Sequence, residues 1–123
     1  MLTSVPLAAQ SFDISSNNND LVQTCAGNFY DSGGETGNYG DNENYLTTFQ
    51  SVYDRFMFRF TSFNVLSGDT LYVYDGPTAS DPVIGRYSGT DAPATVISTN
   101  GYITFQFISD SGENDGGWES EIL

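Results

Sequence analysis

The sequence contains no histidine and no lysine, and its 123 residues include three arginines and one cysteine. The lack of histidine removes the usual general base, the imidazole metal ligand and the side chain that titrates near neutral pH. Ser-His-Asp and Cys-His catalysis are therefore impossible within this chain. Because Cys25 is alone, there is no internal disulfide and no thiolate zinc site. Its thiol either packs as a small hydrophobic group or bridges to another chain.

Basic residues are also too few to balance the acids. Sixteen Asp and Glu residues give a formal net charge of −13, which repels phosphate backbones and anionic lipid surfaces. No segment approaches the roughly 20 apolar residues of a membrane span. We therefore expect no nucleic acid partner and no membrane insertion. The surplus carboxylates either stay solvated or are partly offset by a divalent cation.

Aromatic and turn-forming residues are abundant instead. Nine Phe, eight Tyr, one Trp and 13 Gly favour strands and turns over helices. In "YDRFMFRFTSF", Phe56, Phe58 and Phe60 share one face, which we expect to be core. In "YITFQFISD" the apolar face carries Ile103 and Phe105, followed by Phe107.

Turn signals divide the chain into about nine or ten short strands at hairpin spacing, with no credible helix. Asn100-Gly101 is the strongest hairpin signal. This pattern predicts an all-β, two-sheet antiparallel β-sandwich of the jelly-roll type. Residues 11–123 are expected to form this single domain. The start, "MLTSVPLAAQ", residues 1–10, resembles the end of a secretory signal cleaved after Ala9, or is an unstructured leader.

Several ordered motifs carry a family resemblance. "LYVYDGPTASDPVIGRYSG", "PATVISTNGYITFQFISD" and "GGWESEI" follow one another as in the second half of a CUB domain. The first half, "CAGNFYDSGGETGNYGDNENYLTTF", resembles the version found in secreted multidomain bacterial proteins. The resemblance covers about residues 22–123 and implies a jelly-roll sandwich. In it Asp75 ends a strand, and we expect this residue to hydrogen-bond its own turn.

The sequence departs from the family in its cysteines. CUB domains usually carry one or two disulfides, but the partner that the resemblance implies for Cys25, near Gln50, is absent. Ser88 stands where many members have cysteine. The resemblance therefore leaves stability to the aromatic core or to a metal.

The resemblance also implies a calcium site. Calcium-binding CUB domains hold the ion with a Glu before the Tyr-Asp-Gly strand, an Asp at its start and the Asp of the Ser-Asp loop. Carried over, the two Asp positions fall on Asp69 and Asp110, while the Glu position falls near Leu66, which cannot bind an ion. Oxygens of the following loop would add to the site, from Ser111 and Asn114. Asn64 or Glu113 are alternatives for the missing acid, and solvated turn-capping by both Asp residues is the other interpretation.

A second acidic cluster follows from the residues themselves. Asp31, Asp41 and Glu43 lie in a Gly-rich loop together with Asn42 and Asn44, so several oxygens could converge on one cation. The alternative is a solvated acidic loop without a ligand. No EF-hand pattern is present.

The resemblance implies a secreted, calcium-binding CUB-like domain at the cell surface or outside the cell, which contacts an extracellular protein or glycan. A glycan would be bound by stacking on exposed aromatic rings, and the candidates for such a platform are Tyr39, Tyr45, Tyr72, Tyr74, Tyr87 and Trp118. The alternative is that these residues pack in the core, Trp118 above all. A second hypothesis is a filament subunit that binds copies of itself through Ca²⁺ or through donation of residues 11–24. No carboxylate pair stands out for hydrolysis, so we do not expect an enzyme.

Overall fold

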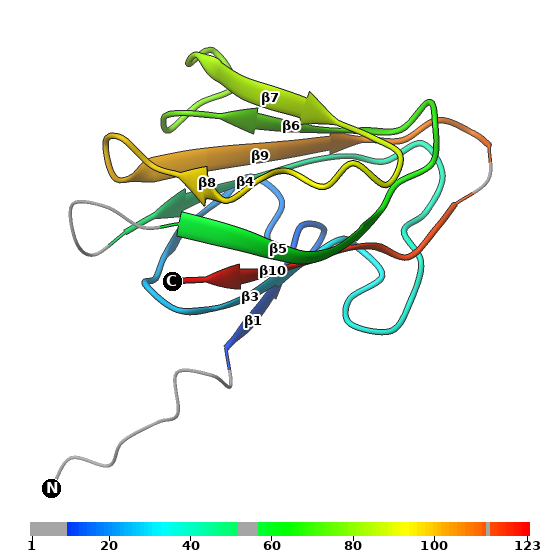
Figure 1. Ribbon diagram of the computed structural model, residues 1–123, viewed down its shortest axis with the longest axis horizontal. Coiled ribbons are helices and arrows are strands. Elements are labelled where there is room, and N and C mark those ends of the chain that lie inside the picture. The colour runs from blue at the N-terminus through cyan, green and yellow to red at the C-terminus, as the bar shows by residue number, and fades with distance from the viewer. Residues whose placement is uncertain (1–9, 52–56, 113) are drawn as a thin grey trace, which may run out of the picture.

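Two stacked β-sheets form the protein in the computed structural model, which describes residues 10–51, 57–112 and 114–123 (Figure 1). One sheet has the order β1-β3-β10-β5-β8 and the other β2-β4-β9-β6-β7. The strands are β1 (Ser11–Asp13), β2 (Asp20–Gln23), β3 (Gly27–Tyr30), β4 (Asn44–Gln50), β5 (Met57–Asn64), β6 (Thr70–Tyr74), β7 (Val83–Tyr87), β8 (Val96–Ile97), β9 (Tyr102–Ile108) and β10 (Gly117–Ile122). Within the described residues no helix is long and apolar enough to span a membrane. The predicted all-β sandwich is confirmed.

The inner strands pair antiparallel, whereas β1 pairs with β3 and β2 with β4 in parallel. The Asn-rich turn between β1 and β2 does not close a hairpin, because these strands belong to different sheets. It crosses the edge of the sandwich instead. There the Asn19 amide donates to the Leu46 carbonyl, and the Thr47 hydroxyl donates to the Asn17 carbonyl. Residues 11–23 thus supply an edge strand to each sheet.

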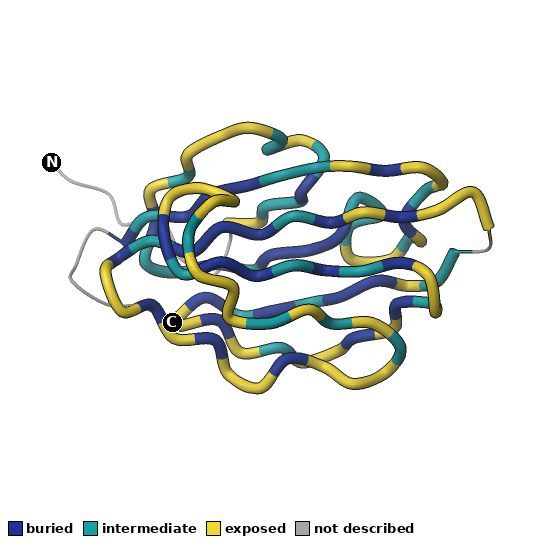
Figure 2. Tube along the Cα trace, turned by 90° about the horizontal axis from the view of Figure 1, so that it is seen from above, coloured by how far each residue is buried: buried dark blue, intermediate teal, exposed yellow. Residues whose placement is uncertain are grey.

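The core is built from aromatic rings between the sheets. Buried positions concentrate on the inner strands of both sheets (Figure 2), whereas the edge strands β2 and β7 have none. The Phe105 ring centroid lies 4.8 Å from that of Phe29 and 4.9 Å from that of Phe58. The side chains of Ile103, Phe105 and Phe107 are fully buried, which confirms the predicted apolar face of β9. Fully burying such a side chain contributes about 1.5–3 kcal/mol.

A β-bulge changes which residues of β5 face the core. Phe58 is buried and Phe60 is half-buried, as predicted, while Phe56 lies outside the described residues. The register with β10 shifts between Glu119 and Ser120. A bulge adds one residue to a strand and so reverses the alternation of faces beyond it. Phe63, five positions after Phe58, therefore also reaches the core.

The hairpin predicted at Asn100-Gly101 is wrong. β8 pairs with β5 in one sheet, whereas β9 lies in the other, so the turn joins two sheets. The Ser98 hydroxyl accepts the Gly101 amide at 2.6 Å and holds the turn. The expectation that Asp75 hydrogen-bonds its own turn is also wrong. Its carboxylate accepts the Thr99 hydroxyl at 2.6 Å and so stabilises the Asn100-Gly101 turn.

The N-terminal segment is described from Gln10 onward. The proposed leader, residues 1–10, falls outside the described residues except for Gln10, whose carbonyl accepts the Asn28 amide at 3.1 Å. Gln10 therefore already pairs with β3. Cys25, between β2 and β3, is a half-buried free thiol.

Candidate cation sites at the loop end

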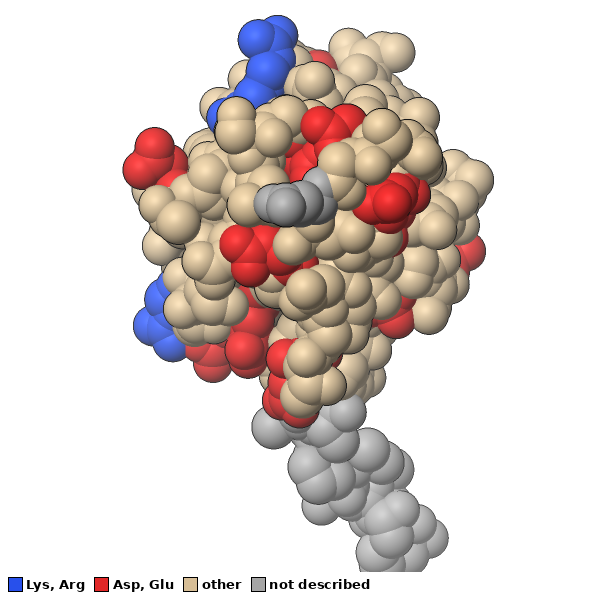
Figure 3. All heavy atoms as spheres, turned by 90° about the vertical axis from the view of Figure 1, so that its right-hand side faces the viewer, with Lys and Arg blue, Asp and Glu red and all other residues tan. Residues whose placement is uncertain are grey.

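Three loops meet at one end of the sandwich, on the right of Figure 1. They are the β3–β4 loop (31–43), the β5–β6 loop (65–69) and the β9–β10 loop (109–116), and we call this region the loop end. The Asn42 amide donates to the Asp110 carbonyl at 2.9 Å, and the Tyr39 amide to the Asp115 carbonyl at 3.2 Å. Acidic side chains are spread over this end (Figure 3). Backbone contacts thus fix the loops that carry both candidate clusters.

Asp69 is buried beneath the loop end, with 1% of its surface exposed. Its Oδ2 accepts the Tyr39 hydroxyl at 2.6 Å, and its Oδ1 accepts the Asp110 amide at 2.8 Å. The same hydroxyl accepts the Leu66 amide at 2.9 Å. Burial and the bond to Asp69 raise the pKa of Tyr39, so the phenol keeps its proton. Tyr39 therefore ties all three loops to one carboxylate.

Asp110 lies directly beside Asp69 but is exposed. Its Oδ1 accepts the Gly112 amide at 2.8 Å. A pocket of about 250 Å³ opens here, lined by Leu66, Ser67, Asp110 and Gly112. The Asp110 backbone thus contacts the Asp69 carboxylate, while the Asp110 side chain lines a small pocket.

This pair meets only part of what a calcium ion requires. Leu66 occupies the region of the third acid, Glu113 lies outside the described residues, and Asn64 is exposed at the end of β5. No group of three or more acidic, His or Cys side chains able to hold a metal occurs in the described part of the chain. Calcium accepts carbonyl and water oxygens where carboxylates are lacking. The residues present fit a weak site with two carboxylates.

The two remaining residues predicted for this site do not join the pair in the structure. Ser111 is exposed, and nothing in the structure directs it toward Asp69. The Asn114 side chain instead donates from Nδ2 to Asp41 Oδ1 at 2.9 Å, in the second cluster. Asn114 therefore connects the β9–β10 loop to the β3–β4 loop.

The second cluster centres on Asp31, which is fully buried. Its carboxylate accepts the Gly33 amide at 3.0 Å and the Trp118 amide at 3.2 Å. Burial raises the pKa of Asp31 to about 7; the backbone amides oppose this rise, and the charge of Glu43 adds to it. The structure thus places Asp31 and Glu43 within electrostatic range of each other.

Glu43 is 9% exposed and reaches back into its own loop. Its Oε2 accepts the Gly40 amide at 2.6 Å and the Ser32 hydroxyl at 2.5 Å. Its Oε1 is buried and has no hydrogen-bond partner among the described residues. The Glu43 amide donates to the Ser109 hydroxyl at 2.8 Å, which joins the loop to the end of β9.

Sequence reasoning missed the roles of Tyr39, Ser32 and Ser109 in these clusters. It named Tyr39 only as one of six aromatic residues in a sugar platform. Tyr39 and Trp118 are each 1% exposed and belong to the core, so they cannot form such a platform. Tyr72 and Tyr74 do stack, with ring centroids 6.4 Å and planes 13° apart. A lone aromatic residue in a Gly- and Asn-rich loop was the available signal for Tyr39.

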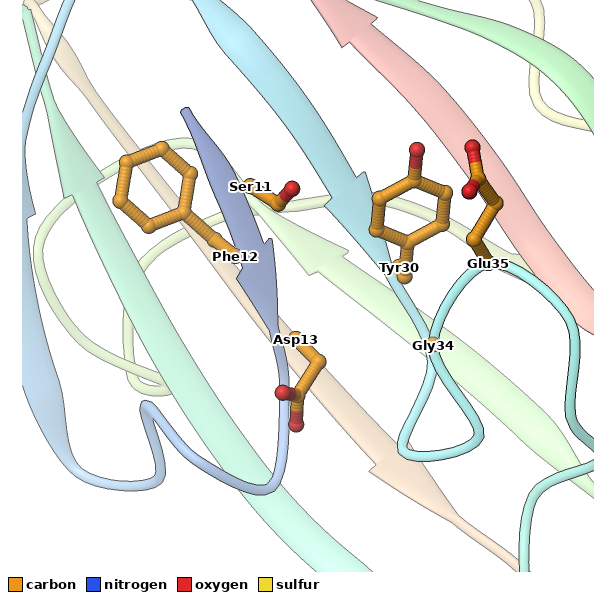
Figure 4. Close-up of a pocket in the computed structure, with 6 residues that line it drawn as sticks. All are labelled: Ser11, Phe12, Asp13, Tyr30, Gly34 and Glu35. Carbon is orange, nitrogen blue, oxygen red and sulfur yellow. The ribbon is translucent and has the colours of Figure 1, made fainter. Parts of the chain in front are cut away.

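A separate pocket of about 260 Å³ lies beside β1, lined by Ser11, Phe12, Asp13, Tyr30, Gly34 and Glu35 (Figure 4). Burial, followed by the charges of Glu119 and Glu35, raises the pKa of Tyr30. Burial opposes ionisation of Asp13, but hydrogen bonds from Ser15 and Ser16 outweigh it and lower the pKa of Asp13. The pocket therefore presents a neutral phenol among carboxylates.

Comparison with known proteins identifies the family. The family model for the CUB domain matches residues 25–121. Rat cubilin (Rattus norvegicus) is 31% identical over 109 residues, covering 78% of this chain and 3% of cubilin. Human Tolloid-like protein 1 is 34% identical over 55 residues, covering 45% of this chain and 5% of that protein. The chain therefore spans only a small part of these relatives.

Solved structures agree in fold. The MASP-1 CUB2 domain bound to Ca²⁺ superposes with a TM-score of 0.70 at 16% identity, covering 85% of this chain and 97% of that one. The CUB1-EGF-CUB2 region of human MASP-1/3 gives a TM-score of 0.71 at 18% identity, covering 85% of this chain and 41% of that one. At such identities the likeness establishes the fold alone. Together with the family match, it shows that the chain belongs to the CUB domain family.

Proposed function

We propose that this chain is a secreted CUB domain that binds Ca²⁺ at Asp69 and Asp110 and uses its loop end to contact a basic extracellular protein. The observation that carries the proposal is the buried Asp69 carboxylate, which accepts the backbone amide of Asp110, whose own side chain lines a small pocket. Two adjacent anions repel each other, and a cation between them would offset that repulsion. The Ca²⁺-bound MASP-1 CUB2 domain, which shares this fold, supports the choice of ion.

The chain's own residues define what the ion would organise. Asp69 is held by Tyr39 and by the Asp110 amide, so an ion at this pair would join the β5–β6 and β9–β10 loops. Ser67 lines the same pocket as Asp110. When bound, Ca²⁺ would supply positive charge and coordination that stiffen the loops.

Charge favours a basic partner. The net charge is −13, and acidic side chains are spread over the loop end (Figure 3). Complementary charge accelerates encounter and selects partners more than it adds affinity. A basic protein surface would therefore dock here faster at low ionic strength than at high ionic strength.

Thermal unfolding with excess CaCl₂ and then with excess EGTA tests the ion. A site whose Kd lies about a hundredfold below the free ion concentration adds roughly 2.7 kcal/mol, which is several degrees for a domain of this size. Asp110→Asn should reduce the shift, because it removes one charge while keeping an acceptor for the Gly112 amide. Asp20→Asn, a change of an exposed acid on β2, is the matched control. Equal shifts in wild type and Asp110→Asn would remove this pair as the site.

The filament alternative remains a prediction. Strand donation would require residues 11–24 to leave their own domain, where they supply an edge strand to each sheet. Ile14, within this segment, is fully buried. No contact in the structure favours that release, so we do not develop it further.

A further inference from the structure

The buried carboxylates of Asp31 and Glu43 lack a counter-charge. Asp31 is fully buried and Glu43 is 9% exposed. The basic residues in the described part are Arg59 on β5 and Arg86 on β7, and Arg59 pairs with Glu121. Neither carboxylate forms an ion pair with a described residue. Buried ionised groups without a partner are costly, so this pair calls for a compensating positive charge.

One oxygen in this cluster is positioned but unused. Glu43 Oε2 is held by the Gly40 amide and the Ser32 hydroxyl, which fixes the orientation of the carboxylate. Glu43 Oε1 is shielded from solvent and makes no hydrogen bond to a described residue. An unsatisfied buried acceptor costs about 1–3 kcal/mol, and more when charged. The folded loop thus holds a fixed carboxylate oxygen without a partner among the described residues.

A second unused oxygen comes from the neighbouring loop. Asn114 Oδ1 is likewise buried and unpartnered within the described chain. The same side chain is anchored by its bond to Asp41, two positions before Glu43. The nearby contact between the Tyr39 amide and the Asp115 carbonyl holds the two loops together. The two unpartnered oxygens therefore belong to two loops that contact each other.

We propose that one Ca²⁺ ion binds at this junction, ligated by Glu43 and Asn114, with Asp31 as the second negative charge and Asp41 at the rim. Calcium suits an irregular set of carboxylate, amide and water oxygens, whereas Mg²⁺ demands a near-ideal octahedron. The site shares only the choice of ion with the proposed function and uses different residues from the Asp69–Asp110 pair.

The single tryptophan provides an independent signal for this site. The Trp118 amide donates to Asp31, so the indole belongs to a residue that contacts the cluster. Trp118 Nε1 is the third buried atom without a described partner. As a donor it cannot bind the ion. Terbium, a luminescent substitute for calcium, should therefore show emission sensitised by tryptophan when it binds here.

Calorimetric titration with CaCl₂ and tryptophan-excited titration with Tb³⁺ test the inference. We expect the wild type to bind two ions, and Glu43→Gln to lose one of them together with the sensitised emission. Asn114→Ala should weaken the same site at least tenfold and guards against misfolding of the Glu43 variant. Glu35→Gln, a change of an exposed acid in the same loop, should match the wild type.

The variants separate this site from the Asp69–Asp110 pair. Loss of one ion in Asp110→Asn, with the sensitised emission retained, supports both sites. A wild type that binds one ion, lost in Glu43→Gln but kept in Asp110→Asn, supports this inference and overturns the proposed Asp69–Asp110 site. Unchanged stoichiometry and emission in folded Glu43→Gln and Asn114→Ala overturn the inference, and a proton would then neutralise the pair.

Discussion

Asp69 and Asp31 are both buried at the loop end, yet their surroundings differ. Asp69 accepts a phenol and a backbone amide, at 2.6 Å and 2.8 Å, and its neighbour Asp110 is exposed. Asp31 accepts only backbone amides from described residues, and its neighbour Glu43 is buried with one oxygen unused. Solvent can screen the charge of Asp110, whereas Asp69, Asp31 and Glu43 are all shielded from it.

The difference shows that the family position and the unpartnered buried oxygens do not coincide here. The family resemblance selects Asp69 and Asp110, where protein donors already satisfy the buried carboxylate. The unsatisfied oxygens lie in the other cluster. Completeness of hydrogen bonding, more than the number of acids, thus distinguishes a carboxylate that the fold has stabilised from one that still requires a partner.

The largest expected loss of stability comes from a substitution that pushes against the buried Asp31 side chain. Gly117 has a φ of 74°, and a Cβ there would lie 2.1 Å from Asp31 Cγ. Left-handed strain of about 1–2 kcal/mol adds to overpacking of about 1–3 kcal/mol. Gly117→Ala should therefore lower the free energy of unfolding in urea by roughly 2–5 kcal/mol.

The adjacent glycine provides the control. A Cβ at Gly116 would meet no atom within 4 Å, so we expect Gly116→Ala to change stability by less than about 1 kcal/mol. Gly68→Ala probes the other cluster, where a Cβ would lie 2.5 Å from Asp110 Oδ2, the end of an exposed side chain that can move. Gly68→Ala should lower the free energy of unfolding by more than Gly116→Ala and by less than Gly117→Ala. Equal losses at Gly117 and Gly116 would contradict a rigid Asp31 site.

The pH dependence of stability should also distinguish the clusters. The pKa of Asp31 rises from 3.8 to about 7 on folding, so the folded state binds this proton more tightly. Its contribution to stability is complete below about pH 4 and is lost as the pH rises through about 7. In EGTA, stability of the wild type relative to Asp31→Asn should fall across this range in urea titrations. If the stabilities of wild type and Asp31→Asn changed in parallel with pH, Asp31 would not have the raised pKa in the folded state.

Much of the fold could be predicted from the sequence because alternation reports burial directly. Phe58 and Phe105 lie in the core as their strands' patterns indicate. The Asn100-Gly101 turn misled because a local turn signal does not specify which sheet the next strand joins. The bulge beside Thr61 was likewise invisible, since it depends on the pairing with β10.

The site was less predictable, because hydrogen-bond partners come from distant segments. The family resemblance singled out Asp69 and Asp110, and residue spacing singled out the second cluster, but neither showed that Asn114 serves the second one. Nor could they show that the Trp118 amide closes over Asp31, 87 positions away in sequence. Tyr39 was misjudged because an aromatic residue in a loop can face solvent or core, and only the three-dimensional arrangement decides.

The smallest of the expected effects tests whether protein donors stabilise Asp69. Tyr39→Phe removes the hydroxyl that donates to Asp69 Oδ2 and accepts the Leu66 amide, while the ring still packs on Phe107, 4.8 Å away. Leaving buried partners unpaired costs about 1–3 kcal/mol, measurable by urea unfolding in EGTA. Tyr45→Phe is the control, since the Tyr45 hydroxyl has no hydrogen bond to a described residue. A loss at Tyr39 no greater than at Tyr45 would mean that water replaces the phenol, and that the two carboxylates differ less than their contacts indicate.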